Sequence, residues 1–486
     1  MMTDLAQVGL WINGQEGSAS SGEYFPVIDP GNGKVIGQAA RGMSEDVDRA
    51  VSAARAALHS KEWQGINPYE RGYLMLAWAQ KIKEHKDSLA RLLSIESGKT
   101  LRDCYGDVHT AVRNLEYFSG WADKIYGRVA PTPEQGVFDY MLREPLGVVG
   151  HIVPWNYPLD IFMRGVAPCL AAGNTVVVKP AEETPLASIA LTRLSHEAGF
   201  PPGVINVVTG FGKEAGAALA GHPGLHGLAF CGSIITGKEV LHAAAERITP
   251  VISLELGGKS ACIIFPDANL PKAVVQKARG LAHNSGQSCG ARSRILVPAK
   301  MYDQAVELMQ TTMKKIQLGY GPDDPDMGPL VSEKQLERVS GYIRSGVEEG
   351  ADLICGGRHP ETEPLKNGFF IEPALFGRAK PGMKIIEEEI FGPVTALLTY
   401  DTVEEAVAMA NDTVYGLGAE LWTENLARAH RVAAQLDVSH VTINGSGGFG
   451  VDLPFGGVKQ SGFGREGGWD AIVQYTRIKQ VWVQLD

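Results

Sequence analysis

The sequence predicts an α/β fold with two doubly wound, open-sheet domains and a smaller β element. From Gly147 onward, short apolar runs rich in β-branched residues alternate with helical segments. Parallel strands that are covered by helices on both faces give this pattern. The 486 residues also exceed what one hydrophobic core usually supports, because domains typically contain about 100 to 200 residues. We therefore expect two or three domains.

The N-terminal part, up to about residue 120, is expected to be mostly helical. From Ser44 to Leu58 the apolar residues recur at helical spacing, and Ser44 is a suitable N-cap. A second helix is expected from Tyr69 to Ile95, ending near Gly98.

Six apolar runs after this part are expected to be strands, each followed by a loop and usually by a helix. They are GVVGHIV, NTVVVK, VINVV, HGLAF, VISLE and ACIIF. A second series begins near Cys262, with helices over 270–283 and 301–316 and strands over 293–297 and 394–399. The two series predict two α/β domains.

Two further segments fit neither domain. Apolar and polar residues alternate over Gly136 to Arg143 and over Lys479 to Leu485, which indicates antiparallel or edge strands. An uncovered edge strand invites pairing, so we expect these strands to extend a sheet across a subunit interface. The alternative is that both strands pack within their own subunit.

Composition restricts the possible partners. A formal net charge of −10 disfavours binding to nucleic acid or to anionic membranes, because both need a basic surface. The sequence contains neither a long apolar run nor a basic leader, and we expect a cytoplasmic protein. Its six cysteines have no Cys-x-x-Cys or zinc-like spacing, so neither disulfides nor a metal site is expected.

Two glycine-rich turns follow strands of the first series. Residues 210–215 match the dinucleotide-binding pattern G-x-G-x-x-G/A, but the next strand lacks the acidic residue that would hold a ribose. The turn from Gly232 to Gly237 opens a helix, and the free N–H groups of a helix N-terminus suit a pyrophosphate. A plain tight turn is the alternative.

Three strings supply the parts of an acyl-transfer site: PWNYP at 154–158, LELGGK at 254–259 and GQSC at 286–289. A thiol can act as nucleophile and a carboxylate can activate water. A side-chain amide can donate a hydrogen bond to an oxyanion.

On these motifs the chain resembles the aldehyde dehydrogenase superfamily over nearly its whole length. Glu255 and Cys289 are separated by the interval expected for the family, and PFGG at 454–457 and SGFGRE at 461–466 also match. The resemblance implies that Cys289 attacks the aldehyde, that Asn156 and the Cys289 N–H hold the oxyanion, and that Glu255 deprotonates the hydrolytic water.

The resemblance also implies the domain limits and the assembly. A Rossmann-like NAD-binding domain is expected at 1–122 and 146–257, a catalytic domain at 258–460, and oligomerisation strands at 123–145 and 461–486. The expected partners are a small aldehyde and further copies of the chain, in a homodimer or homotetramer.

For the cofactor, the resemblance places Lys179 and Glu182 on the adenosine ribose. Glu182 would repel a 2′-phosphate, which favours NAD, whereas Lys179 could pair with that phosphate, which makes NADP the alternative. The other cofactor-binding residues implied are Trp155, Gly232, Ser233, Gly257, Glu389 and Phe391.

The expected substrate residues are Tyr157, Arg164, His283 and Phe455. Arg164 stands where many alkyl-aldehyde members have tryptophan, and this arginine resembles succinic semialdehyde, salicylaldehyde and vanillin dehydrogenases. His283 replaces a second arginine of the semialdehyde enzymes. We therefore expect an aromatic or other bulky polar aldehyde, with an ω-carboxylated semialdehyde as the alternative. Arg292 is expected to be a solvated or interface arginine.

Two other functions are considered. A CoA-acylating semialdehyde dehydrogenase would not need the water-activating Glu255. A catalytically silent structural relative would not need Asn156, Glu255 and Cys289 together. Lys99, Lys259, Arg465 and Glu466 also lie in family-like strings, where structural ion pairs explain them at least as well as a direct catalytic role.

Overall fold

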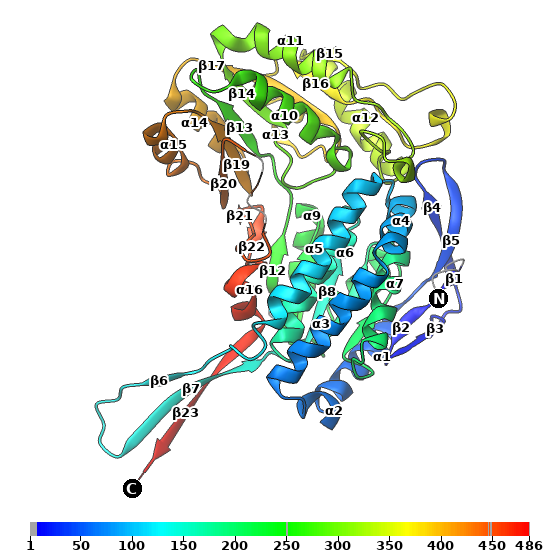
Figure 1. The fold of residues 1–486 in the computed structure, drawn as a ribbon, viewed down its shortest axis with the longest axis vertical. Helices are drawn as coiled ribbons and strands as arrows, with labels where there is room; N and C mark the ends of the chain where they lie inside the picture. Colours follow the sequence, from blue (N-terminus) through cyan, green and yellow to red (C-terminus); the bar gives the residue numbers. More distant parts are fainter. Residues whose placement is uncertain (1–6, 249–250, 446, 448–449, 486) are drawn as a thin grey trace.

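The computed structural model describes residues 7–248, 251–445, 447 and 450–485. It contains two sheets flanked by helices and a thin β arm that projects away from them (Figure 1). Within these described ranges, no helix is both long and apolar enough to span a membrane.

The first sheet is doubly wound. Its strands, in order, are β22 (Gly462–Phe463), β12 (Val251–Glu255), β11 (Gly227–Cys231), β8 (Val148–Val153), β9 (Thr175–Pro180), β10 (Ile205–Val207), β2 (Leu10–Ile12) and β3 (Gln15–Gly17). Strands β8 to β12 run parallel, and the chain order reverses between β8 and β11. Ligands of such sheets bind at the carboxyl ends of the strands beside this reversal.

Helices cover both faces of the first sheet (Figure 1). They are α1 (Ser44–Leu58), α2 (Lys61–Gln64), α3 (Pro68–Glu84), α4 (Lys86–Ser97), α5 (Leu101–Ser119), α6 (Pro158–Ala171), α7 (Pro185–Glu197), α8 (Ala217–Ala220) and α9 (Ile234–Glu246). Helix α1 spans the predicted residues, but the prediction of Ser44 as N-cap is wrong, because Met43 occupies that position and Ser44 is already helical. The single helix predicted over 69–95 is wrong, because the chain breaks at His85 (φ −108°, ψ 15°) into α3 and α4.

From residue 7 to α1 the chain is β structure and turns, so the helical expectation is wrong for residues 7–43. Strands β1 (Gln7–Val8), β4 (Tyr24–Asp29) and β5 (Lys34–Ala40) form a small sheet of their own. β2 and β3 form a hairpin through Asn13 and Gly14, both at positive φ. An Asn-Gly pair is a strong hairpin signal, and the sequence contains it here.

The second sheet forms the other α/β unit. Its strands, in order, are β15 (Asp352–Cys355), β16 (Ala374–Gly377), β17 (Val394–Tyr400), β14 (Arg294–Pro298), β13 (Ala261–Ile264), β19 (Gly418–Trp422) and β20 (His440–Ile443). Its helices are α10 (Leu270–Ala282), α11 (Tyr302–Met313), α12 (Glu333–Glu348), α13 (Lys384–Glu387), α14 (Val403–Asn411) and α15 (Leu426–Ala433). The strands predicted in both series are confirmed.

The arm consists of β6 (Arg128–Ala130), β7 (Val137–Pro145) and β23 (Thr476–Gln484). β7 and β23 are the two predicted edge strands, and they pair antiparallel along their whole length within one chain. Residues 461–475, which were expected to belong to the arm, lie outside it in this chain. Strand β22 joins the first sheet, and α16 (Gly468–Gln474) packs against α6.

Candidate active site

A cavity of about 440 Å³ opens beside the carboxyl end of the first sheet. All four residues expected to contact substrate line this cavity together with Cys289. Its lining includes Tyr157, Ile161, Arg164, Leu281, His283, Cys289, Arg292, Glu420 and Phe455. The structure thus brings the predicted nucleophile and the predicted substrate residues to one place.

Cys289 lies in the loop between the turn His283–Gly286 and β14. Burial raises the pKa of its thiol to about 12, and the carboxylates of Glu389 and Glu255 add to this effect, whereas Arg164 opposes it. The thiol is therefore protonated at neutral pH in this arrangement, and it must lose its proton before it can attack a carbonyl.

The turn that precedes Cys289 has an unusual backbone. Asn284 and Ser285 have φ values of 46° and 52°, which L-residues rarely adopt. Side-chain hydrogen bonds hold both residues: Asn284 Nδ2 donates to the Asn156 carbonyl (2.8 Å), and Ser285 Oγ donates to the Gly328 carbonyl (2.7 Å). The position of the cysteine loop is thus set from two sides.

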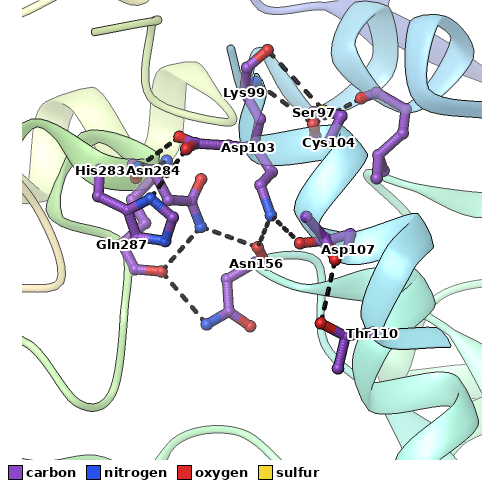
Figure 2. Close-up of polar contacts among 12 residues, drawn as sticks. Ser97, Lys99, Asp103, Cys104, Asp107, Thr110, Asn156, His283, Asn284 and Gln287 are labelled. Carbon is purple, nitrogen blue, oxygen red and sulfur yellow. Dashed lines mark hydrogen bonds and ion pairs between the residues drawn. The ribbon is translucent and has the colours of Figure 1, made fainter. Parts of the chain in front are cut away.

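Asn156 lies directly beside this loop (Figure 2). Its amide Nδ2 donates to the Gln287 carbonyl over 3.2 Å, and its own carbonyl accepts from Lys99 Nζ (3.1 Å) as well as from Asn284. One amide hydrogen is engaged by Gln287, which fixes the plane of the amide. The second hydrogen of the same NH₂ group can serve another acceptor.

Glu255 ends β12 and is buried, with about 3% of its surface exposed. Neither carboxylate oxygen accepts a hydrogen bond from any residue that the structure describes. Burial raises the pKa of Glu255 well above its usual range, and the nearby Glu466 carboxylate adds to the rise. An unsatisfied buried carboxyl with a raised pKa is the state that a general base near neutral pH requires.

Arg164 is already compensated inside the cavity wall. Its Nε lies 2.9 Å from Glu466 Oε2 in an ion pair whose two atoms are not aligned for a hydrogen bond, and the Asp160 carboxylate is a second negative neighbour. Its guanidinium also lies 5.0 Å from the centre of the Phe455 ring. Glu466, one of the four residues for which a structural ion pair was expected, therefore forms such a pair with Arg164.

Tyr157 and His283, which also line the cavity, are stacked on each other, with ring centres 6.1 Å apart and planes at 30°. His283 Nδ1 lies 2.8 Å from Asp103 Oδ1, so one ring nitrogen is committed to that carboxylate. Lys99 packs over the Tyr157 ring and is buried in an ion pair with Asp107 (2.7 Å).

Several candidate cofactor residues lie at the ends of strands or helices or contact one another. Lys179, in β9, places its Nζ 2.9 Å from Oε2 of Glu182, which follows that strand. Ser233 caps the N-terminus of α9. The Gly258 N–H donates to Glu389 Oε1 (2.9 Å), and a Cβ on Gly257 would lie 2.3 Å from Glu389 Oε2. Only glycine at 257 permits this close approach of the carboxylate.

The remaining cofactor candidates also adjoin the site. Trp155 and Phe391 meet edge to face, with ring centres 5.3 Å apart. The Gly232 N–H donates to the Glu255 carbonyl (3.0 Å), and a Cβ on Gly232 would lie 2.5 Å from the Phe230 ring. The turn at 232–237 thus adjoins the base, whereas residues 212–216 form a short π-helical turn.

The expectation that Arg292 is solvated is wrong, because its side chain is only 7% exposed and lines the cavity. Arg292 is buried because of contacts with residues that are distant in the chain. The loop after Cys289 turns inward against β19, where Glu420 supplies a buried carboxylate. Sequence reasoning also missed Lys277 and Glu420, although a glutamate within the apolar run GAELW is a signal that could have pointed to them.

Lys259 and Arg465 are the two other side chains in family-like strings, and neither lines the cavity that holds Cys289. Lys259 is buried, and burial lowers its pKa to about 7. Arg465 donates to the carbonyls of Gly457 (3.0 Å) and Gly464 (2.6 Å). Among the described side chains, no group of three or more His, Cys, Asp or Glu is arranged to hold a metal ion.

Comparison with known proteins agrees with this site. Residues 17–481 match the model of the aldehyde dehydrogenase family. The putative aldehyde dehydrogenase DhaS of Bacillus subtilis is 42% identical over 98% of this chain and 96% of its own length. The mitochondrial benzaldehyde dehydrogenase of Antirrhinum majus is also 42% identical, over 98% of this chain and 89% of its own.

The fold agrees equally well with a solved structure. The NAD⁺ complex of an aldehyde dehydrogenase from Bacillus cereus superposes with a TM-score of 0.96 and 41% identity, covering 99% of this chain and 97% of that one. Similarity of this extent, in sequence and in fold, shows that the chain belongs to the aldehyde dehydrogenase family, whose members oxidise aldehydes.

Proposed function

We propose that the protein oxidises an aromatic or other bulky polar aldehyde to the carboxylic acid, with NAD, through a thiohemiacetal on Cys289. The observation that carries this proposal is the cavity, which joins Cys289 to the aromatic and apolar walls of Tyr157, Leu281 and Phe455. Cavities of this kind orient a planar apolar ligand while a few polar groups act on its reactive end.

In this reaction the Cys289 thiol first gives its proton to water. The thiolate then adds to the aldehyde carbon, and the second amide hydrogen of Asn156 stabilises the oxyanion. When bound, NAD supplies the hydride acceptor that turns the adduct into a thioester. Glu255 then takes a proton from water as the water attacks the thioester, and collapse of this adduct releases the acid and the Cys289 thiolate, which the protonated Glu255 can reprotonate. Because deacylation by water needs a base, the unsatisfied Glu255 carboxyl favours hydrolysis over a CoA-acylating reaction.

Features of the chain fit an NAD molecule. The N-terminus of α9, which the Ser233 side chain caps at the Thr236 N–H, has the positive dipole end that suits a pyrophosphate. The approach of Glu389 to Gly257 and Gly258 leaves one of its oxygens for a ribose hydroxyl. Glu182 remains charged beside Lys179, since that lysine and local hydrogen bonds lower the pKa of Glu182 despite its burial. This carboxylate disfavours a 2′-phosphate, so NAD is preferred over NADP.

The state of Arg164 bears on the substrate. Its charge is already balanced by Glu466 and Asp160, so it has little capacity to bind the carboxylate of a semialdehyde. We assign it to the cavity wall, where it supports Phe455. The Antirrhinum relative, a benzaldehyde dehydrogenase, is compatible with an aromatic substrate.

The test is NADH formation at 340 nm, with NAD and NADP in parallel, across benzaldehydes, aliphatic aldehydes and carboxylated aldehydes. We expect turnover with NAD and a higher kcat/KM for benzaldehydes than for aliphatic aldehydes. Cys289→Ala should abolish turnover, whereas the control Cys355→Ala, in edge strand β15, should retain it. Full activity in Cys289→Ala would refute the nucleophile, and a silent wild-type enzyme would favour a structural relative.

Glu255→Gln separates acylation from hydrolysis. We expect a burst of NADH in the first turnover, followed by slow steady-state release, because the thioester forms but water is not activated. Loss of the burst would contradict the proposed role, since Glu255 would then act before deacylation.

For the organisation of the protein we propose a cofactor domain at 1–122 and 146–257, a catalytic domain at 258–460, and an arm that mediates a homodimer or homotetramer. The two separate sheets support the division into a cofactor domain and a catalytic domain. Large apolar side chains exposed along the arm support the third, and they include Val129, Phe138, Leu142, Ile478 and Trp482.

A further inference from the structure

We propose that Arg292, assisted by Lys277, forms a subsite for a carboxylate at the distal end of the aldehyde substrate. Both side chains line the cavity that holds Cys289. This inference rests on the proposed function and narrows its substrate class to aldehydes with an anionic group remote from the carbonyl. Arg164, whose charge is already balanced, is not the receptor.

The guanidinium of Arg292 is held but not satisfied. Nη1 donates to the Gly290 carbonyl (2.5 Å), while Nε is buried and donates to no group in the part of the chain that the structure describes. A Cβ on Gly418 of β19 would lie 3.3 Å from both Nη1 and Nη2, so the absence of a side chain there gives the guanidinium its place. An arginine that is this deeply buried and incompletely bonded is costly unless a ligand completes its contacts.

The charges around Arg292 do not cancel. Glu420 is the buried carboxylate of the cluster, and its Oε2 lies 3.9 Å from Arg292 Nε. That same oxygen accepts a hydrogen bond from Lys277 Nζ, and Oε1 accepts from Trp422 Nε1 (2.5 Å). Glu420 is thus engaged by Lys277 and Trp422, and two cations face one anion.

Other titratable neighbours do not restore the balance. Burial raises the pKa of the Cys262 and Cys289 thiols, which therefore stay neutral before the reaction, and burial lowers the pKa of His440, which favours its uncharged form. The cluster keeps one positive charge in excess, and an excess buried charge binds a counter-charge strongly because water screens it poorly.

The chemistry of the excess cation identifies the ligand. A guanidinium presents a planar set of N–H donors that match the two oxygens of a carboxylate. Cys289 reacts with the aldehyde end of the substrate, and the side chain of Arg292 lines the same cavity. One molecule that carries both groups, with an apolar body between Tyr157 and Phe455, would use the whole cavity.

The experiment compares 4-carboxybenzaldehyde with its neutral counterpart 4-methylbenzaldehyde. For the wild type we expect a higher kcat/KM with the carboxylated aldehyde. Arg292→Met should lower that kcat/KM about 10- to 100-fold and change the neutral substrate much less, which is the range for one charge-assisted hydrogen-bonding group. Arg292→Lys should retain part of the preference, and the control Arg378→Met, on an exposed arginine, should retain all of it.

Binding of products gives a second readout that needs no turnover. Calorimetric titration should show that terephthalate binds more tightly than 4-methylbenzoate to the wild type, and that Arg292→Met removes the difference. Equal binding of the two acids, or a preference that survives Arg292→Met, would overturn the subsite. If neither aldehyde is oxidised, the proposed function fails, and the titration alone decides whether the subsite exists.

Discussion

Replacing Lys99 by methionine should destabilise the protein strongly, although Lys99 need not touch the substrate. Lys99 and Asp107 form an ion pair of 2.7 Å in which both side chains are less than 5% exposed, and Lys99 Nζ also donates to the Asn156 carbonyl (Figure 2). Methionine preserves the length of the side chain but leaves the Asp107 carboxylate buried without its cation.

The magnitude follows from the burial of the pair. Removing one partner of a buried ion pair costs about 3 to 5 kcal/mol, because the remaining charge is not solvated. If the surrounding domain melts as a unit of roughly 250 residues, at about 2 °C per kcal/mol, the midpoint falls by about 6 to 10 °C. Lys99→Met/Asp107→Leu should recover at least half of this loss, because it removes the orphaned charge.

The deficit should depend on pH. Burial raises the pKa of Asp107 to about 6 even beside Lys99, and loss of Lys99 raises this pKa further. A group whose folded pKa is raised stabilises the fold in its protonated form, and this contribution is lost as pH rises through the folded pKa. The deficit of Lys99→Met should therefore be smaller at pH 5.5 than at pH 8.

Differential scanning calorimetry at both pH values measures these effects. The matched control is Lys81→Met, which removes an exposed ion pair with Glu84 and should cost less than about 1 kcal/mol. The reasoning is refuted if Lys99→Met melts within about 2 °C of the wild type, or if the double variant recovers nothing.

Other parts of the structure give three further expectations. Glu466→Gln removes a negative charge that raises the pKa of Glu255, so the acid limb of the pH profile of kcat should move to lower pH; an unmoved limb would contradict the coupling. Gly257→Ala places a Cβ 2.3 Å from Glu389 Oε2, so in steady-state assays KM for NAD should rise about tenfold with little change in KM for the aldehyde. Trp482→Asp, on the exposed face of β23, should lower the mass measured by light scattering; a wild type that is already monomeric would rule out the arm as an interface.

Much of the fold was predictable because local patterns record burial. The apolar runs at 147–153, 174–179 and 261–265 became strands, and the helix over Ser44–Leu58 has the predicted limits. The β2–β3 hairpin was missed although its turn signal, Asn13-Gly14, is in the sequence. The break at His85 has no such signal, since neither glycine nor proline marks it and the apolar pattern continues across it.

The sequence by itself determined which chemical groups the site contains: the order and spacing of Asn156, Glu255 and Cys289 identify the family and its chemistry. Only the tertiary structure decided which charges remain available. Arg164 was expected to face the substrate and is balanced by Glu466, whereas Arg292 was expected in solvent or at an interface and lies in the cavity wall, where two cations face one carboxylate. Charge balance depends on partners that are distant in the chain, such as Glu466 and Glu420, and a local sequence pattern does not identify these partners.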